Sequence, residues 1–163
     1  MKMSAIKMLD KKKHIDTDKG FRLRYVKSAT ERFRLHNHNY FELCLMVKGK
    51  CNHLINDTVQ PLSEGYLLFI RDYDIHDYVS LDTNEFQFLN LSFETETLKG
   101  AFDYLGVGFD CKTLLTAKYS PFVILTPQER TKLFYSLTDL NSTTDNNLAK
   151  TQMRALLLSI FMK

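Results

Sequence analysis

Short apolar stretches, separated by turn-forming residues, fill the first half of the chain. Phe21–Val26 alternates apolar and polar residues, whereas Tyr66–Ile70 is aromatic or apolar throughout. Alternation is typical of half-buried strands, and short continuous runs are typical of strands covered on both faces. The expected strands are 21–26, 36–48, 51–55, 59–62, 66–70, 75–79 and 86–93, with turns at 48–50, 56–57, 63–65 and 82–84. This succession predicts an antiparallel barrel or sandwich.

The second half of the chain changes to helical patterns. The expected elements are a helix at 94–105, an irregular segment at 109–120, a returning strand at 122–125, and helices at 126–140 and 147–163. The helix at 126–140 has the strongest start signal, because Thr126 can cap it, Pro127 takes its first position and Glu129 lies three residues after Thr126. We therefore predict a mainly β protein with C-terminal α structure, in which two to three helices follow the strands. Its expected divisions are a flexible N-terminal arm at 1–20, a β-region at 21–93 and a helical region at 94–163.

Apolar residues spread around most of the final expected helix. A helix that is apolar all round needs burial on more than one side, so we expect a homodimer interface there in preference to ordinary core. The helix also reaches Lys163 without a glycine or another cap. We therefore expect that the protein continues beyond this sequence.

Composition and charge narrow the function classes. The 163 residues are 44% hydrophobic and 25% charged, which suits one globular domain. A net charge of +3 is too small to argue for nucleic-acid binding by this segment, and the run Lys11–Lys13 is interpreted as part of the solvated arm. Three cysteines without metal-type spacing are expected to be reduced thiols in a cytoplasmic protein. No apolar run approaches the length of a membrane span.

Metal-capable side chains share one face of the 36–48 strand. His36, His38 and Glu42 are all even-numbered, so on a regular strand they point to the same side. At about 3.3 Å per residue, the two imidazoles lie about 7 Å apart and the carboxylate about 13 Å further on, so strong twist or coiling has to bring them together. His76 and Tyr78 share a face of the 75–79 strand in the same way. Buried polar groups of this kind need partners.

The pattern His36-x-His38-x-x-x-Glu42, followed after six further residues by Gly49, resembles the first sequence motif of the cupin superfamily. The resemblance implies a small double-stranded β-barrel, or jelly roll. Cupin enzymes hold iron, manganese, nickel or zinc in such a barrel. Imidazole and carboxylate ligands suit these divalent ions.

The second cupin motif is matched in part. Gly65 and His76 stand at the expected separation, although Arg71 and Tyr73 replace the proline and the glycine of that motif. The resemblance implies that His76 joins the two histidines and the glutamate of the first motif inside the barrel.

One subgroup fits the sequence better than the cupin enzymes do. Residues 20–100 resemble the N-terminal sensor domain of AraC-type transcriptional regulators, particularly the chitobiose-operon regulator group, which shares a pattern like H-x-H-x-Y-x-E-L. That pattern stands here at 36–43, and the block Gly65–His76 and the strand ending at Phe93 also match. The resemblance implies a barrel that binds an effector, often a sugar, and following helices that form a dimer. It also implies a pair of helix-turn-helix motifs for DNA binding, which would lie beyond residue 163.

Eight residues are candidates for ligand binding. Arg34 precedes His36 by two positions and is expected to be able to point inward. Asn90 falls where arabinose-binding members place a stacking tryptophan, which argues against arabinose itself. The candidate ligand-binding residues are His36, His38, Glu42, His76, Tyr78, Arg34, Tyr40 and Asn90.

Three interpretations stay open for the quartet His36, His38, Glu42 and His76. It could bind a divalent metal (zinc, nickel, iron or manganese), form a metal-free polar pocket, or serve as a purely structural cluster. The sensor hypothesis requires no cofactor, because the family often works without a metal.

The sequence favours an effector-sensing, dimerising domain of a bacterial transcriptional regulator that takes a sugar or a similar small polar molecule. Binding is expected to shift the population between two arrangements of the barrel and the helices. The alternative is a stand-alone metal-dependent cupin enzyme, such as a sugar isomerase or a dioxygenase, with Glu42 as general base. No nucleophile, second acid or phosphate loop accompanies Glu42, so we expect no enzyme and assign no catalytic residue. A storage or scaffold cupin is the third hypothesis.

Overall fold

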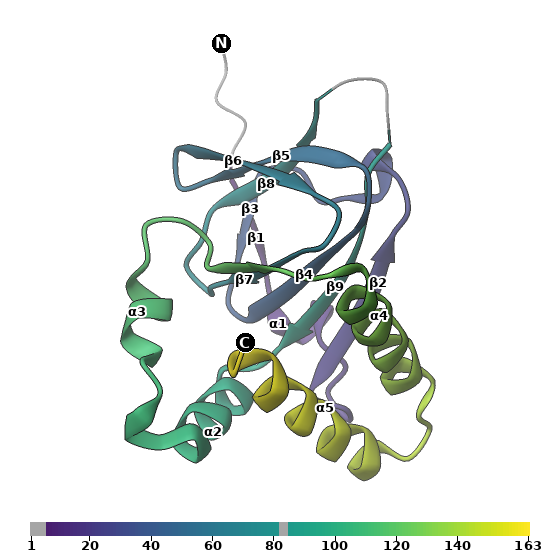
Figure 1. Cartoon of the computed structure of the whole chain (residues 1–163), viewed down its shortest axis with the longest axis vertical. Helices are drawn as coiled ribbons and strands as arrows, with labels where there is room; N and C mark the ends of the chain where they lie inside the picture. The colour runs from purple at the N-terminus through teal and green to yellow at the C-terminus, as the bar shows by residue number, and fades with distance from the viewer. Residues whose placement is uncertain (1–5, 82–84) are drawn as a thin grey trace.

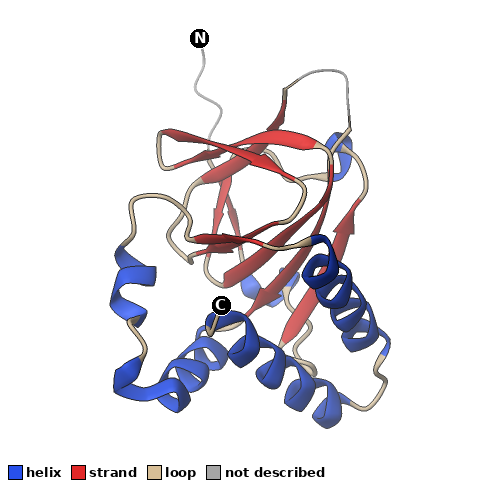
Figure 2. Cartoon of the chain, viewed as in Figure 1, coloured by secondary structure: helices blue, strands red, loops and turns tan. Residues whose placement is uncertain are grey.

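The computed structural model describes residues 6–81 and 85–163, so the turn expected at 82–84 lies outside the described residues. The strands form two five-stranded sheets that lie face to face (Figure 1). The C-terminal helices lie on the side of the second sheet that faces away from the first (Figure 2). The chain is therefore built in three layers, with two sheets and one layer of helices.

Each sheet combines strands from distant parts of the chain. The first sheet holds, in spatial order, β1 (Lys7–Leu9), β3 (His36–His38), β8 (His76–Ser80), β5 (Lys50–Ile55) and β6 (Thr58–Ser63). The second sheet holds, in spatial order, β10 (Phe122–Ile124), β7 (Tyr66–Ile70), β4 (Phe41–Lys48), β9 (Gln87–Phe93) and β2 (Phe21–Val26). β1 runs parallel to β3, and the other paired strands run antiparallel.

The predicted class, mainly β with C-terminal helices, is confirmed. The two facing sheets agree with a cupin-like jelly roll, but the described strands form two separate hydrogen-bonded sheets and no closed barrel. Pro61 lies in β6 at an edge of the first sheet, which is where a residue without an N–H donor is tolerated.

β4 shows how the two faces of a strand are used. Phe41, Leu43 and Leu45 belong to the apolar cluster that joins the second sheet to the helices, whereas Cys44 and Met46 belong to the cluster between the two sheets. All five side chains are buried, as the continuous apolar run predicts. The even-numbered positions of β4, which include Glu42, therefore face the space between the sheets.

Four turn residues have a backbone conformation that most side chains avoid. Asn56 and Asp57, at the predicted turn between β5 and β6, have φ angles of 44° and 62°. Gly49 and Gly65 have φ angles of 80° and 89°. A Cβ added at Gly49 would lie 2.6 Å from the Glu85 carbonyl oxygen, and one added at Gly65 would lie 2.9 Å from the Leu125 carbonyl oxygen. Both motif glycines are therefore required by φ and by close backbone approach.

The helices are α1 (Lys11–His14), α2 (Thr95–Leu105), α3 (Cys111–Thr116), α4 (Pro127–Ser142) and α5 (Asn146–Phe161), with 3-10 turns at Ala29–Glu31 and Gly106–Gly108. Four α-helices thus follow β9 in the described residues 85–163, where two to three were expected. The additional helix is α3, which replaces part of the irregular segment expected at 109–120. Asp110 caps α3, because its side chain accepts a hydrogen bond from the Thr113 N–H.

The capping box predicted at the start of α4 is confirmed. The Thr126 side chain accepts from the Glu129 N–H, and the Glu129 carboxylate accepts from the Thr126 N–H. The returning strand expected at 122–125 is β10, which pairs with β7 at the edge of the second sheet.

The described part of the N-terminal segment differs from the flexible arm expected at 1–20. β1 pairs with β3, and Leu9 and Ile15 are buried against Tyr40. These two residues lie six positions apart in a mostly polar sequence, so no periodic pattern marked them. The pairing covers the outer edge of β3, which carries two of the candidate ligand histidines.

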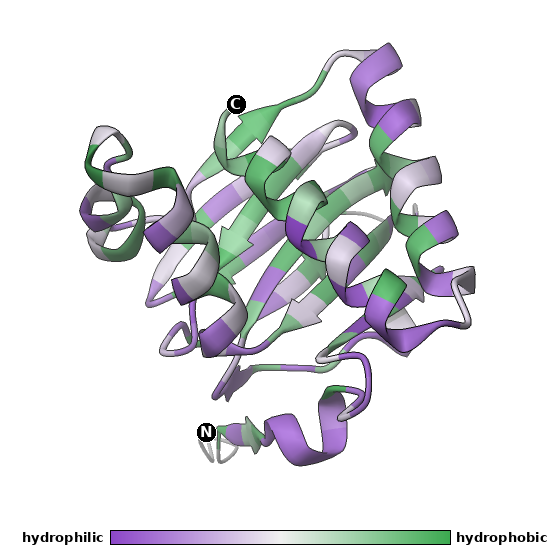
Figure 3. Cartoon of the chain, turned by 90° about the horizontal axis from the view of Figure 1, so that it is seen from below, coloured by the Kyte–Doolittle hydropathy of each residue, from purple (hydrophilic) through white to green (hydrophobic). Residues whose placement is uncertain are grey.

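α5 packs on the second sheet through one face, which holds Ala149, Met153, Leu157 and Ile160. Leu148 and Met162 remain 51% and 72% exposed. Figure 3 views the helical side, with α5 lying across the strands behind it. Within residues 6–81 and 85–163, no helix has both the length and the apolar character needed to cross a bilayer.

Candidate functional site

A break in the predicted 36–48 strand brings its metal-capable residues together. The strand ends after His38, and the chain passes through residues 39–40 into β4 of the other sheet. His36 and His38 therefore point inward from the first sheet, while Glu42 points inward from the second. His76 joins them, because it is the cross-strand partner of His36 in β8.

The four side chains meet in a compact, buried cluster. One ring nitrogen from each of His36, His38 and His76 lies within 4.8 Å of the other two. Glu42 Oε2 lies 3.5 Å from His38 Nε2 and 3.9 Å from His76 Nε2. None of the four residues is more than 4% exposed. The convergence expected from the sequence is thus present.

Surrounding hydrogen bonds orient the two histidines of β3. His36 Nδ1 donates to the Arg34 carbonyl oxygen at 2.8 Å, and His38 Nδ1 donates to the Tyr40 carbonyl oxygen at 2.7 Å. A carbonyl can only accept, so each Nδ1 carries the proton and leaves Nε2 for the cluster. Among the described residues, Nε2 of His38 and Nε2 of His76 have no hydrogen-bond partner.

Glu42 is held in place through its other carboxylate oxygen. Oε1 accepts from Asn90 Nδ2 at 2.7 Å and from Ser92 Oγ at 3.0 Å. Burial raises the pKa of Glu42, but His38, His36 and the Asn90 amide outweigh it and lower that pKa to about 2. The carboxylate is therefore ionised at neutral pH, and Oε2 is directed at the histidines.

The histidines of the cluster differ in their affinity for protons. Burial lowers the pKa of His36, and it lowers the pKa of His76 further, with the neighbouring histidines adding to the effect. Burial acts in the same direction on His38, but the Glu42 carboxylate outweighs it and raises the pKa of His38. Two neutral imidazoles and one His38–Glu42 pair are therefore the state expected without a ligand.

This donor set fits a divalent cation. One ring nitrogen from each of three histidines lies within 4.8 Å of the other two, and the Glu42 carboxylate lies beside His38 and His76. Nε2 of both these histidines is buried without a hydrogen-bond partner. Zinc, nickel, iron and manganese accept imidazole and carboxylate ligands. The residues that would hold such an ion are His36, His38, His76 and Glu42.

The hollow beside the cluster is small. Its volume is about 20 Å³, which is about the room that one water molecule needs. Its walls are Arg24, Arg32, Phe33, His36, Glu42, His76, Tyr78, Phe88 and Asn90. A monosaccharide does not fit this space without side-chain movement.

A larger groove, of about 510 Å³, lies elsewhere, between residues 17–20, α2 and α5. None of the candidate ligand residues lines it, and the aromatic side chain on its wall, Tyr104, is 79% exposed. We place the candidate site at the histidine cluster, because unpartnered buried polar atoms point to a ligand more directly than open volume does.

The remaining candidate residues have different placements. Arg34 is a candidate only if it points inward, and it does not: its side chain is exposed, and only its carbonyl oxygen contacts the cluster. Tyr40 stacks on the His38 ring, with centroids 4.5 Å apart, and is part of the core. Asn90 holds Glu42, and Tyr78 lines the small hollow. Arg24, which is not among the candidates, also lines that hollow.

His53 is a buried residue beside the cluster that the sequence pattern did not single out. It is 0% exposed, and its Nε2 lies 3.2 Å from His76 Nδ1. Burial lowers the pKa of His53 to about 4, so the ring is neutral at pH 7. Its position was open to prediction, because Cys51, His53 and Ile55 occupy alternate positions on the buried face of β5.

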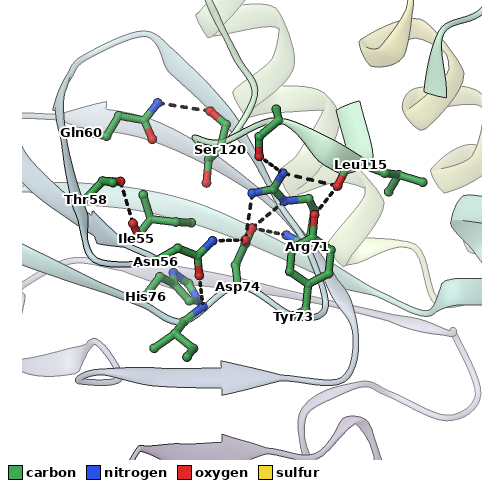
Figure 4. Close-up of polar contacts among 12 residues, drawn as sticks. Ile55, Asn56, Thr58, Gln60, Arg71, Tyr73, Asp74, His76, Leu115 and Ser120 are labelled. Atoms are coloured by element: carbon green, nitrogen blue, oxygen red, sulfur yellow. Dashed lines mark hydrogen bonds and ion pairs between the residues drawn. The ribbon is translucent and has the colours of Figure 1, made fainter. Parts of the chain in front are cut away.

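A second buried polar network lies beside the cluster, in the loop between β7 and β8. Arg71 is 1% exposed and binds the Asp74 carboxylate through Nε at 3.0 Å and Nη2 at 2.9 Å. Figure 4 shows the Arg71 guanidinium between Asp74 and the Leu115 carbonyl, and Arg71 also donates to the Ala117 carbonyl. The arginine that replaces the motif proline thus anchors the end of α3.

Comparison with known proteins identifies the family of the chain. The family model described as the AraC-like ligand binding domain matches residues 19–143, which is most of the chain. The HTH-type transcriptional activator RhaR from Klebsiella pneumoniae subsp. pneumoniae is 34% identical over 74 residues, covering 45% of this chain and 26% of RhaR.

Solved structures of ToxT from Vibrio cholerae strain SCE256 share the fold. An apo variant has a TM-score of 0.67 at 9% identity, over 91% of this chain and 56% of that one. The unsaturated fatty acid bound wild-type protein has a TM-score of 0.56 at 8% identity, over 87% and 52%. The chain spans about a quarter of the length of RhaR and about half of these ToxT chains. On the strength of the family match over residues 19–143, this chain belongs to the AraC-like ligand binding domain family.

Proposed function

We propose that this chain is the effector-sensing domain of a DNA-binding transcriptional regulator. We further propose that its ligand site is the cluster of His36, His38, His76 and Glu42. Membership of the AraC-like ligand binding domain family supports the sensing role. The RhaR relative is a transcriptional activator, and it extends well beyond the matched region. DNA binding by the whole protein is therefore part of the proposal and is assigned to no residue of this chain.

We also propose that the cluster holds a divalent metal ion. The observation that carries this step is the pair of buried Nε2 atoms of His38 and His76, which have no hydrogen-bond partner and lie 3.5 and 3.9 Å from the Glu42 carboxylate. Without a cation the His76 Nε2 lone pair is desolvated and unsatisfied, which is costly, and His38 Nε2 has only the Glu42 carboxylate, 3.5 Å away, beside it. A bound ion would supply a Lewis acid to which the hydroxyl or carboxylate oxygens of an effector could bind.

The proposed effector is a sugar or a similar small polar molecule. The hollow at the cluster has room for about one water molecule, so an effector has to displace side chains at its rim, such as Arg24 and Phe33. The effector would therefore bind only the conformation in which these side chains have moved, and so it would favour that conformation over the other.

Homodimerisation through α5 completes the proposal. Leu148 and Met162 are exposed at opposite ends of this helix, outside the face that packs on the sheet. Exposed apolar residues on an outer helix suit a two-fold interface, in which the same surface of both copies meets.

A metal titration tests the site. Protein stripped with a chelator is titrated with Zn²⁺, Ni²⁺, Mn²⁺ or Fe²⁺ while the melting temperature is measured. We expect at least one of these ions to raise the melting temperature of the wild type and of His14→Ala, which lacks an imidazole outside the cluster. The same ion should leave His76→Ala unchanged. Equal stabilisation of His14→Ala and His76→Ala by the ion would mean that the metal binds outside the histidine cluster.

An effector screen follows on the metal-loaded protein. Mono- and disaccharides, with an unsaturated fatty acid for comparison, are scored by the same thermal shift. A sugar that stabilises the wild type but not Tyr78→Phe supports the proposed pocket, because this variant loses only the buried hydroxyl of a residue that lines the hollow. A response to the fatty acid alone would overturn the assignment of a polar effector.

A metal-dependent enzyme is the second function that the cluster supports, because four ligands can leave coordination positions open for a substrate. The discriminating observation is the fate of the small molecule. A sensor returns its effector unchanged after prolonged incubation, whereas an isomerase or dioxygenase converts it, which NMR of the mixture detects.

A further inference from the structure

His53 and Gln60 form a buried row of hydrogen-bonding side chains that ends at His76. Both residues face each other across the β5–β6 pair, where they are register partners. His53 Nδ1 lies 3.5 Å from Gln60 Oε1, and His53 Nε2 lies 3.2 Å from His76 Nδ1. His53 is 0% exposed and Gln60 is 7% exposed, so neither can exchange these partners for bulk water.

The contact of Gln60 with Ser120 fixes the direction of the hydrogen bonds in this row of side chains. Gln60 Nε2 donates to the backbone carbonyl oxygen of Ser120 at 3.2 Å, as Figure 4 shows. A carbonyl oxygen can only accept, so the amide nitrogen of Gln60 faces Ser120 and the amide oxygen faces His53. An amide oxygen likewise only accepts, so His53 Nδ1 carries a proton.

The same logic continues to the cluster. A neutral imidazole has one donor and one acceptor, so His53 Nε2 is an acceptor. It therefore accepts from His76 Nδ1, and the proton of a neutral His76 lies on Nδ1. His76 Nε2 is left without a proton and with its lone pair beside Glu42 Oε2, 3.9 Å away.

We infer that His53 and Gln60 are positioning residues that hold His76 in the tautomer able to bind a cation through Nε2. His36 and His38 obtain the same tautomer from backbone carbonyls. His76 obtains it from two side chains, which makes the arrangement at this ligand sensitive to substitution. The role as an aid to metal binding rests on the proposed function, whereas the tautomer itself does not.

Loss of such a partner weakens metal binding without removing a ligand. Supporting hydrogen-bond partners of metal-ligating histidines typically contribute about 10- to 100-fold in metal affinity. We expect that loss for His53→Leu, which leaves His76 Nδ1–H without an acceptor. His53→Gln should bind metal within a few-fold of the wild type, because its amide oxygen can accept from His76.

Gln60→Leu provides a variant that leaves both histidines intact. It removes the acceptor that fixes the His53 proton, so His53 and His76 can both move their protons to Nε2. We expect weaker metal binding and a mixture of His76 tautomers. Gln128→Leu, at an exposed position in α4, is the matched control.

The tautomer is measured on metal-free protein. Proton–nitrogen correlation spectra of protein labelled with nitrogen-15 histidine distinguish Nδ1–H from Nε2–H rings, and His76→Ala assigns the signal. We expect His76 to be protonated at Nδ1 in the wild type and in Gln128→Leu, and to be mixed in Gln60→Leu. A His76 ring protonated at Nε2 in the wild type overturns the inference.

Metal affinity is then measured by competition with a coloured chelator. Wild-type affinity in His53→Leu, with the fold intact by circular dichroism, also overturns the inference. If His53→Leu does not fold, Gln60→Leu decides in its place. If the wild type binds no divalent metal, the proposed metal site fails, and the spectra still decide whether His53 and Gln60 set the His76 tautomer.

Discussion

His38 Nε2 and Glu42 Oε2 lie 3.5 Å apart, although the two residues belong to different sheets. The chain turns between them at residues 39–40, so this contact joins the sheets at the corner where β3 becomes β4. It also contributes to the charge of the cluster: burial raises the pKa of Glu42, but His38, together with His36 and Asn90, lowers it to about 2.

Glu42→Gln should remove both a proposed metal ligand and the one carboxylate of the four-residue cluster. The amide keeps the shape of the side chain, and its oxygen can still accept from Asn90 and Ser92. We expect metal affinity to fall by more than the roughly 10- to 100-fold typical of a lost supporting partner, because a direct, charged ligand is removed. Isothermal titration with Zn²⁺ measures the change.

Glu96→Gln serves as the control for this substitution, because the Glu96 side chain is 75% exposed. It removes the same charge from the protein at a distance from the cluster. Equal affinities for the two variants would mean that Glu42 is not a metal ligand.

Acid should destabilise the metal-free domain, and His53 should contribute. Its pKa is about 4 in the folded protein against 6.5 when unperturbed, so between these values the unfolded chain binds more protons. The stabilisation is fully present above pH 6.5 and is lost as the pH falls towards 4. The shift corresponds to about 3 kcal/mol in the free energy of unfolding. His36 and His76 act in the same direction, and His38, whose pKa is raised, acts in the opposite one.

Urea unfolding at a series of pH values between 7 and 4 measures this dependence. His53→Gln cannot take up the proton, so its free energy of unfolding should change less over that range than that of the wild type. His14→Ala removes an imidazole outside the cluster and serves as the comparison. Burial lowers the pKa of His14 as well, so its curve should also flatten, but less than that of His53→Gln. Parallel pH curves for the wild type and His53→Gln would contradict the prediction.

Arg71→Met should destabilise the fold strongly. It leaves the fully buried Asp74 carboxylate without its cation, and breaking a buried pair on one side costs about 3–5 kcal/mol. Arg130→Met breaks the more exposed pair with Glu64 and should cost at most about 1 kcal/mol. Denaturant unfolding of both variants gives the comparison, and similar losses would show that burial of the Arg71 pair has no special weight.

The sequence alone predicted the features that rest on local pattern. Phe21–Val26 and Tyr66–Ile70 are strands with the expected bounds, because their side-chain pattern and flanking turns agree. The capping box at Thr126 follows from residue types three positions apart. The convergence of His76 with the His36 strand came from motif spacing and is present in the structure.

Features that depend on contacts between distant segments were missed. The pattern from His36 to Glu42 is continuous, so nothing local marks the corner between β3 and β4. Arg71 resembles an ordinary loop arginine until Leu115 and Ala117, more than forty positions later, bring their carbonyls to it. Arg34 lies just before β3, where its carbonyl oxygen, and not its side chain, reaches His36.

The proposed dimer predicts that charge on α5 separates the copies without unfolding them. Leu148→Glu combined with Met162→Glu places two carboxylates on the outer side of α5, where both native side chains are exposed. In a two-fold interface each change occurs twice, so like charges meet in an apolar contact and the dimer should dissociate. Tyr135→Glu, at a 60% exposed aromatic on α4, is the control and should leave the assembly unchanged. Sedimentation velocity at several concentrations, with circular dichroism to verify the fold, measures the outcome. A dimer that persists in the double variant would assign the contact to another surface, and a wild type that stays monomeric throughout would remove dimerisation from the proposal.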